Sequence, residues 1–402
     1  MIAAALPLTA LIAAVTALAF WLDYRVPALS KVGASLLALL LGAVLTNTHV
    51  VPAASPVYDA IAGPVTSLAI AWLLLSVNLG DLRRAGPRMV GAFGLALAGT
   101  ALGAAVGAFA FAAHLGDDAW RLAGTLTGTY SGGSLNFVAV GRGVGLPDAL
   151  FAGATAADAL TTGLWMAATL VLPLWIGRFY APVPASATNR PGAGADTVAS
   201  EAAARPGLEA DAPDEADHRH HPFFKPTPIS TMDLAVLLAL GLVLLLASEV
   251  VGRWTPGIPA VLWLTTFALI VGHTRRFRNP AGAFQLGTVA LHLFFVVIGI
   301  WSRVSEIVEV GAEVWFYTLV VVGVHGLIVY GVGRAARLDV GTLSVASQAA
   351  IGGPSSALAV AVSREWPGLV LPGIIVGLFG YAVGNYLGFG VAYLVRAVGV
   401  GL

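Results

Sequence analysis

The sequence contains no cysteine in its 402 residues and few charged side chains. The absence of cysteine excludes disulfide bonds, thiolate zinc sites, iron–sulfur clusters and cysteine nucleophiles. Only 10% of the residues are charged, against about a quarter in an average soluble domain. These charges are too few to cover a soluble protein of this size, so the composition excludes a cytosolic enzyme and a disordered regulator.

Neither sign of charge is in excess, because 21 lysine and arginine residues balance 21 aspartate and glutamate residues. A chain without a net basic field does not attract phosphate backbones, and we expect no nucleic-acid partner. The sequence also lacks the GxSxG, HExxH, P-loop and dinucleotide-binding motifs. We therefore expect no enzymatic activity and no cofactor, unless Na⁺ is counted as one.

Apolar residues make up 58% of the chain and fall into runs of the length that crosses a bilayer, about 20 residues. The chain is thus predicted to be an all-α polytopic membrane protein. The twelve runs cover residues 2–22, 32–51, 60–79, 89–113, 122–141, 149–177, 234–248, 254–272, 281–302, 314–333, 340–363 and 366–395.

A polar segment divides the runs into two sets of six. We predict a first transmembrane repeat at 1–178, a polar and disordered linker at 179–229, and a second transmembrane repeat at 230–402. The linker histidines His218, His220 and His221 are interpreted as solvated side chains and not as a metal site.

The two sets share an internal pattern. Gly132-Gly133 corresponds to Gly352-Gly353, and at the same offset Pro147 corresponds to Pro367 and Gly153 to Gly373. The charges of corresponding loops are reversed: arginines follow the third run at 83, 84 and 88, whereas glutamates follow the ninth at 306, 309 and 313. Because cytoplasmic loops are enriched in lysine and arginine, the sequence predicts two repeats of inverted topology, an arrangement typical of secondary transporters.

Inversion requires an odd number of crossings in each half, although each half has six runs. Paired glycines in the middle of an apolar run break an α-helix, and irregular backbone at membrane depth is tolerated only where protein or water satisfies it. We predict broken or re-entrant helices at Gly132-Gly133 and Gly352-Gly353, with ten full crossings. The alternative is that a long run, such as 366–395, is split in two. The two breaks are expected to lie near the bilayer midplane within about 15 Å of each other.

Asp158 is the charged residue that lies deepest inside an apolar run. A carboxylate at membrane depth is costly to bury and is a candidate functional group. With Thr161 and Thr162 one turn away, it is predicted to bind the coupling cation, either Na⁺ or H⁺. The alternative is a structural hydrogen bond to a neighbouring helix.

The residues around the two breaks supply small hydroxyl and amide groups next to freed backbone atoms. Half-helix ends and freed carbonyls of this kind bind anions and cations in transporters. The predicted substrate-binding residues are Thr129, Ser131, Gly132, Gly133, Ser134, Asn136, Gly352, Gly353, Ser355 and Ser356, with Gln348 and Asn385 as weaker candidates. The mid-run histidines His292 and His325 are interpreted as structural and hydrogen-bonded, with a proton relay as the alternative.

The glycine-centred segments at 128–140 and 351–361, with the segment 371–385, resemble the YjcL-like family of multi-pass membrane proteins of unknown function. The resemblance covers nearly the whole chain outside the linker. At the level of architecture that family is similar to the cation:proton antiporter and anion-transporter superfamily, which includes sodium:glutamate and bile-acid:sodium symporters. By this resemblance the glycine pairs would be the tips of crossing, broken helices.

Taken together, the residues predict a cation-coupled symporter of a small organic anion or amino acid in the cytoplasmic (inner) cell membrane. The expected partners are a small-molecule substrate and the lipid bilayer, and a homodimer is compatible with the sequence. One alternative is a Na⁺/H⁺-type antiporter that uses Asp158 alone. Another is a membrane sensor or scaffold that docks a partner through the acidic linker.

Overall fold

The computed structural model describes residues 2–399 except 3, 27–28, 30–32, 185–186, 188–227, 275–276, 278–279 and 302–303, and omits the side chains of 304–311, 355 and 362. The described part is almost entirely helical, as predicted. Most of the predicted linker lies outside the described residues.

The first half of the chain forms a series of apolar helices. They are α1 (Ala5–Arg25), α3 (Ala34–Asn47), α4 (Pro56–Ala60), α5 (Thr66–Leu75), α6 (Leu82–Ala85), α7 (Pro87–Ala110), α8 (Ala112–Leu115), α9 (Ala119–Gly132), α10 (Ser134–Gly143) and α11 (Asp148–Ile176). A π-helical turn at Ile61–Val65 joins α4 to α5 and contains Pro64. Proline lacks the N–H for an ordinary helical bond, so the ladder widens where it lies.

The second half is also a series of apolar helices. Its helices are α14 (Thr231–Trp254), α15 (Ala260–Gly272), α16 (Ala283–Trp301), α17 (Val304–Ala335), α18 (Val340–Ile351), α19 (Gly353–Ser363) and α20 (Pro367–Ala397). Local chemistry sets several starts: Ser230 and Asp233 form a capping box on α14, and the Asp339 side chain accepts from Thr342 N–H on α18. Within the described residues, eight helices are long and apolar enough to cross a membrane, and α3, α15 and α18 are shorter apolar helices.

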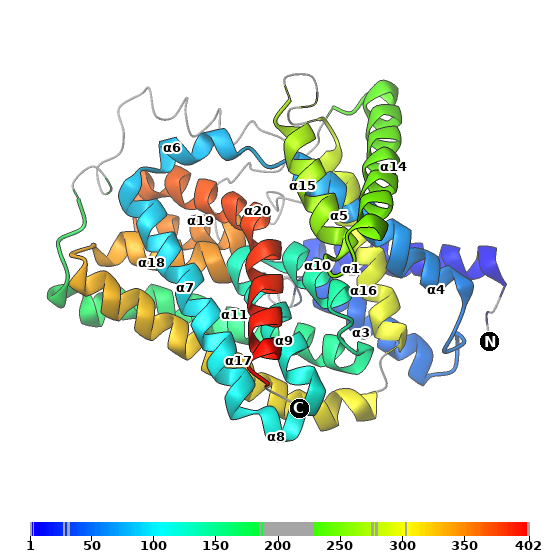
Figure 1. Cartoon of the computed structure of the whole chain (residues 1–402), viewed down its shortest axis with the longest axis horizontal. Coiled ribbons are helices and arrows are strands. Elements are labelled where there is room, and N and C mark those ends of the chain that lie inside the picture. The colour runs from blue at the N-terminus through cyan, green and yellow to red at the C-terminus, as the bar shows by residue number, and fades with distance from the viewer. Residues whose placement is uncertain are drawn as a thin grey trace.

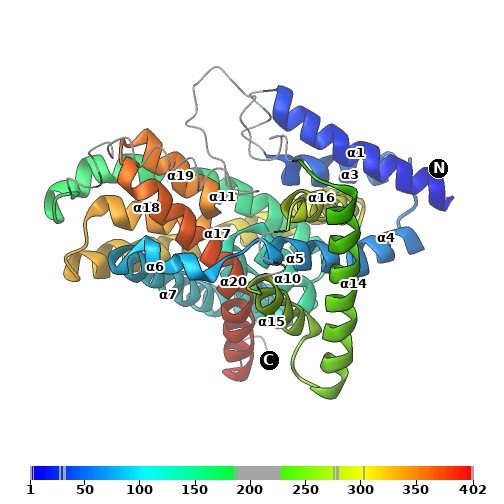
Figure 2. The same ribbon diagram turned by 90° about the horizontal axis from the view of Figure 1, so that it is seen from above.

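The helices assemble into two bundles, and each bundle takes helices from both halves (Figure 1). The first bundle contains α1, α3, α5, α14, α15 and α16, and the second contains α7, α9, α10, α11, α17, α18, α19 and α20. In both views α20 lies between α19 on one side and α10 on the other (Figures 1 and 2). The two broken runs therefore belong to the same bundle and flank the same long helix.

Glycines allow the backbones of α7 and α17 to approach closely. A β-carbon at Gly103 would lie 2.5 Å from the Val321 carbonyl oxygen, and one at Gly99 would lie 3.0 Å from the Cα of His325. Small residues at such contacts are typical of membrane helices, because lipid provides no hydrophobic drive and close packing must supply the attraction. The apolar, glycine-rich sequence of α7 thus serves the packing of the second bundle.

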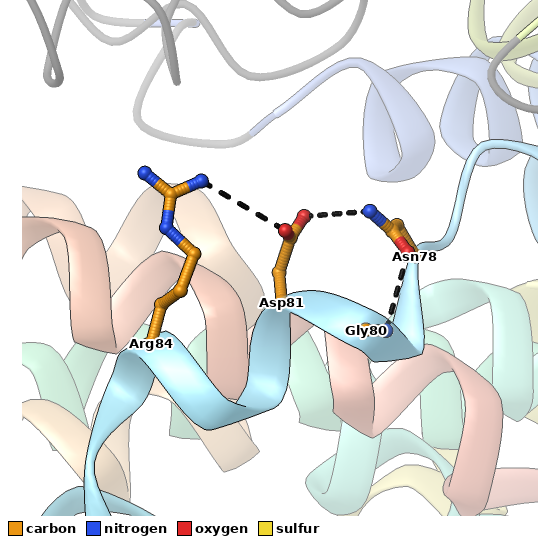
Figure 3. A network of polar contacts seen from close by, with 4 residues as sticks. All are labelled: Asn78, Gly80, Asp81 and Arg84. Carbon is orange, nitrogen blue, oxygen red and sulfur yellow. Dashed lines mark hydrogen bonds and ion pairs between the residues drawn. The ribbon is translucent and has the colours of Figure 1, made fainter.

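A polar turn connects α5 to α6 (Figure 3). Asn78 accepts a hydrogen bond from Gly80 N–H at 3.2 Å and donates one to the Asp81 carboxylate at 2.9 Å, and Arg84 pairs with Asp81 at 3.8 Å. The ring of His273, just after α15, accepts from Leu79 N–H at 2.7 Å. These bonds fix the turn that precedes α7.

Candidate functional site

Both glycine pairs interrupt their helices, which confirms the predicted breaks. In the first run α9 ends at Gly132, α10 begins at Ser134, and Gly133 between them has φ +82°. In the second, α18 ends at Ile351 and α19 begins at Gly353, which has φ +79°. Because a side chain is strained in this left-handed region, glycine is the residue that permits each break.

Both breaks lie against one tyrosine of α20. A β-carbon at Gly133 would lie 3.8 Å from Cε1 of Tyr381, and one at Gly353 would lie 3.8 Å from its hydroxyl oxygen. Two positions that contact the same ring are closer than about half a bilayer thickness, roughly 15 Å, as the sequence predicts. The breaks thus meet in space although they are far apart in sequence.

Asn136 fastens the first break to α20. Its side chain is fully buried, and its amide donates to the Gly380 carbonyl at 3.0 Å. No methyl group fits around it, since β-carbons at Gly132 and Gly384 would each lie 2.2 Å from its Nδ2. The side-chain oxygen of Asn136 has no hydrogen-bond partner, and it is a free acceptor at the break.

Asp158 of α11 faces the end of α9. Its carboxylate accepts from the Thr162 hydroxyl at 3.3 Å, and the side chains of Thr129 and Tyr130 face the same carboxylate. Thr161 is hydrogen-bonded to another hydroxyl, on Thr318 of α17, at 2.7 Å. Oxygen atoms from α9 and α11 therefore gather beside one partly buried carboxylate, and hard cations prefer oxygen ligands.

Tyr130 brings the kink and the carboxylate together. Its backbone leaves the helical region (φ −83°, ψ 16°), and its fully buried hydroxyl faces Asp158, Thr161 and Thr318 without a well-aligned hydrogen bond. The neighbouring Ser131 hydroxyl is also fully buried and has no partner. Buried polar atoms are nearly always paired in folded proteins, so unpaired ones at a break indicate a place for a ligand.

The second break also has an unpaired buried polar group. Gln348 is fully buried, its side chain is hydrogen-bonded to Thr169 of α11 at 3.2 Å, and the other end of its amide has no partner. A β-carbon at Gly352 would lie 2.7 Å from that end. Gln348 thus points a free polar atom at the second glycine pair.

The remaining predicted residues are placed less centrally. Ser134 is exposed, and Ser356 donates to the carbonyl of Gly352 at 2.9 Å. The backbone of Ser355 lies in α19, but its side chain lies outside the described residues. Asn385 donates to Thr265 of α15 at 2.8 Å and so faces the first bundle.

Some residues of the site were missed by sequence reasoning. Tyr130 lies inside the glycine-centred segment 128–140, but it is not among the predicted site residues. Thr318, Thr169 and Trp165 carry no local signal, because threonines back-bonded to a helix and tryptophans in apolar runs are ordinary in membrane helices. Only the packing of α17 and α11 against the breaks brings them to the site.

The two mid-run histidines are hydrogen-bonded, as the structural interpretation expects. His292 contacts the Thr288 carbonyl at 2.7 Å and Ser35 at 3.3 Å, and His325 contacts Thr100 and Ser347. The linker histidines lie outside the described residues. In the part of the chain that is described, no group of three or more histidine, aspartate or glutamate side chains could hold a metal ion.

Comparison with known proteins assigns the protein chain to a family. The chain belongs to the family described as "Protein of unknown function (DUF819)", whose model matches residues 10–398. It is also similar to the "Uncharacterized membrane protein YjcL" of Bacillus subtilis (strain 168), with 26% identity over 392 residues that span 94% of this chain and 93% of that protein. The family resemblance inferred from the glycine-centred segments is confirmed, and the protein is a multi-pass membrane protein.

Proposed function

We propose that the protein is a cation-coupled secondary transporter that carries a small organic anion or an amino acid by symport. The observation that carries the proposal is the set of unpaired buried polar atoms at the two breaks: the side-chain oxygen of Asn136, the hydroxyls of Tyr130 and Ser131, and the amide of Gln348. Each unpaired buried group costs about 1–3 kcal/mol, which a bound ligand would recover.

In this proposal the cation and the substrate occupy neighbouring places. Asp158 with Thr129, Thr162 and the Tyr130 hydroxyl would hold the cation, and the space between the glycine breaks would hold the substrate. Na⁺ fits the oxygen-only environment of Asp158, since hard cations prefer carboxylate and hydroxyl oxygens. The proposed location is the cytoplasmic membrane of the cell, and the proposed role is transport without catalysis.

A screen of thermal stability tests the symport proposal. The purified protein is heated with a panel of small carboxylates and amino acids, in NaCl or in choline chloride at equal ionic strength. Symport predicts that a compound raises the melting temperature more strongly in NaCl, because cation and substrate stabilise the same folded state by mass action. Antiport through Asp158 alone predicts an effect of Na⁺ or pH that no organic compound enhances.

We also propose that the halves are inverted repeats. The helix contacts support this relation between the halves. Helix α1 contacts α3 and α16, and in the same way α14 contacts α15 and α5. Under this pairing α14 takes the place of α1, α15 that of α3, and α16 that of α5. The reversed loop charges point to the same relation.

Cysteine accessibility tests the inversion, and a chain without cysteine needs no prior replacements. Single cysteines at Arg84 and at Arg276, which lies outside the described residues, should react with an impermeant maleimide from the same, cytoplasmic side. A cysteine at Asp117, in the exposed turn before α9, should react from the other side. Labelling of positions 84 and 276 from opposite sides would end the inverted-repeat proposal.

A further inference from the structure

A chain of hydrogen bonds runs from α11 to the kink in α9 and passes through one histidine. Trp165 Nε1–H donates to the Ser347 hydroxyl at 2.9 Å, and that hydroxyl contacts Nε2 of His325 at 2.8 Å. On its other side, Nδ1 of His325 contacts the Thr100 hydroxyl at 2.9 Å. Thr100 donates to the backbone carbonyl of Tyr130 at 3.0 Å.

The two ends of the chain and the burial of His325 fix the protons between them. A backbone carbonyl only accepts, so the single Thr100 proton points to Tyr130, and Thr100 must accept from Nδ1–H of His325. An indole N–H only donates, so Ser347 accepts from Trp165 and has one proton of its own to give. Because a second proton would place a charge on a fully buried ring, His325 is neutral with its proton on Nδ1, and Ser347 donates to Nε2.

The neighbouring helices leave room for the residues of this hydrogen-bond chain. Gly99 leaves room for the backbone of His325, and Gly326 leaves room for the Trp165 ring, whose outer carbon would lie 2.4 Å from a β-carbon there. His325 is fully buried, the Trp165 ring stands at 90° to its ring at 5.7 Å, and the carbonyl of Ala96 also faces it. The imidazole is held from three neighbouring helices.

This chain of hydrogen bonds joins the two broken runs. Tyr130 lies at the first break, and its hydroxyl faces Asp158; Ser347 lies on α18, one residue before Gln348, whose free amide end points at the second break. Trp165, where the chain begins, lies on the same helix as Asp158, about two turns further on. The contacts thus pass from α11 through α18, α17, α7 and α9 and return to α11.

We infer that His325 is a positioning residue that couples the two breaks, so that a change at the cation site by Asp158 reaches the substrate groups of α18. The functional meaning of this coupling rests on the proposed transport activity, whereas the coupling itself does not. A shift of the Tyr130 carbonyl would move Thr100, then His325 and then Ser347. The reason is that each of these side chains has a single proton and donates it to the next group of the hydrogen-bond chain. His325 itself would touch neither cation nor substrate.

Nitrogen NMR of the unmodified protein tests the proton assignment. With ¹⁵N-labelled histidine, the signals of His325 are identified as those lost in His325→Asn. The inference predicts a protonated Nδ1 and an unprotonated Nε2 at neutral pH, since the two nitrogens have distinct shifts in each state. A proton on Nε2, or an imidazolium, would overturn the directional chain.

Hydrogen exchange tests the coupling without any ligand. Ser347→Ala cuts the chain on α18, and the readout is the amide exchange of peptide 127–137 at the first break. We expect exchange there to become about fivefold faster, the effect of roughly one lost hydrogen bond. Ser344→Ala is the matched control. The Ser344 hydroxyl is also buried on α18, but it is hydrogen-bonded to Tyr330 at 2.9 Å and not to any residue of the hydrogen-bond chain.

The same exchange measurement in the His325→Asn protein tests whether the coupling passes through His325. In His325→Asn, adding Ser347→Ala should have no further effect on peptide 127–137, since the path is already cut. Equal effects of Ser347→Ala and Ser344→Ala at the first break, or an undiminished effect of Ser347→Ala in the His325→Asn protein, would contradict the coupling.

The transport proposal can fail separately from this inference. If neither Na⁺ nor pH changes the thermal stability of the wild-type protein through Asp158, cation coupling is wrong. The NMR and exchange results still decide whether His325 links the breaks.

Discussion

Replacing Asp158 by asparagine is expected to weaken the apparent affinity for Na⁺ by more than about a hundredfold, while the protein still folds. Asparagine keeps the size of the side chain and its ability to bond Thr162, but it removes the charge that offsets the cation. Even outer-shell partners of metal ligands contribute about 10- to 100-fold to affinity, and a charged ligand contributes more. The measurement is the rise in melting temperature along a NaCl titration.

Asp117→Asn is the matched control, because Asp117 is an exposed carboxylate outside the long helices. It should titrate with Na⁺ like the wild-type protein. An Asp158→Asn protein with unchanged Na⁺ dependence would mean that the carboxylate is structural. The coupling ion would then have to be sought among the neutral oxygens of the two breaks.

Replacing Asn136 by alanine is expected to abolish the effect of the substrate on thermal stability. The change removes the free side-chain oxygen at the first break and the hydrogen bond to the Gly380 carbonyl of α20. The lost hydrogen bond should lower the free energy of unfolding by about 0.5–1.5 kcal/mol. Stability is measured by thermal unfolding without ligand, and binding by the shift with the compound found in the screen.

Asn385→Ala separates the two effects. Asn385 is also fully buried, also donates one hydrogen bond and also has an unpaired oxygen, but its partner is Thr265 of the first bundle. It should lower stability by a similar amount and leave the substrate effect in place. If Asn136→Ala retained the substrate effect, the space between the breaks would not be the binding site.

The breaks could be predicted from the sequence because their cause is local. A glycine pair in an apolar run leaves its mark whatever surrounds it, and Gly133 and Gly353 do adopt backbone angles that favour glycine. Asp158 could be singled out for a similar reason, since a lone carboxylate in an apolar run is costly anywhere. The family could be recognised from the same glycine-centred segments.

The partners of these residues could not be predicted, because they depend on how distant helices pack. Thr318 reaches the Asp158 site only because α17 packs on α11, and Thr100 reaches the kink only because glycines let α7 approach its neighbours. The grouping of helices from both halves into each bundle is likewise a matter of tertiary packing. Hydropathy indicates that a helix spans a membrane, but it does not indicate which helix lies beside it.

Direct binding of Na⁺ tests the central claim, which is that Asp158 holds the coupling cation at the first break. Purified wild-type, Asp117→Asn and Asp158→Asn proteins are equilibrated with radioactive Na⁺ over a range of concentrations at fixed pH. We expect saturable binding to the wild-type and Asp117→Asn proteins and none to Asp158→Asn in the same range. Equal saturable binding to all three proteins would contradict the account.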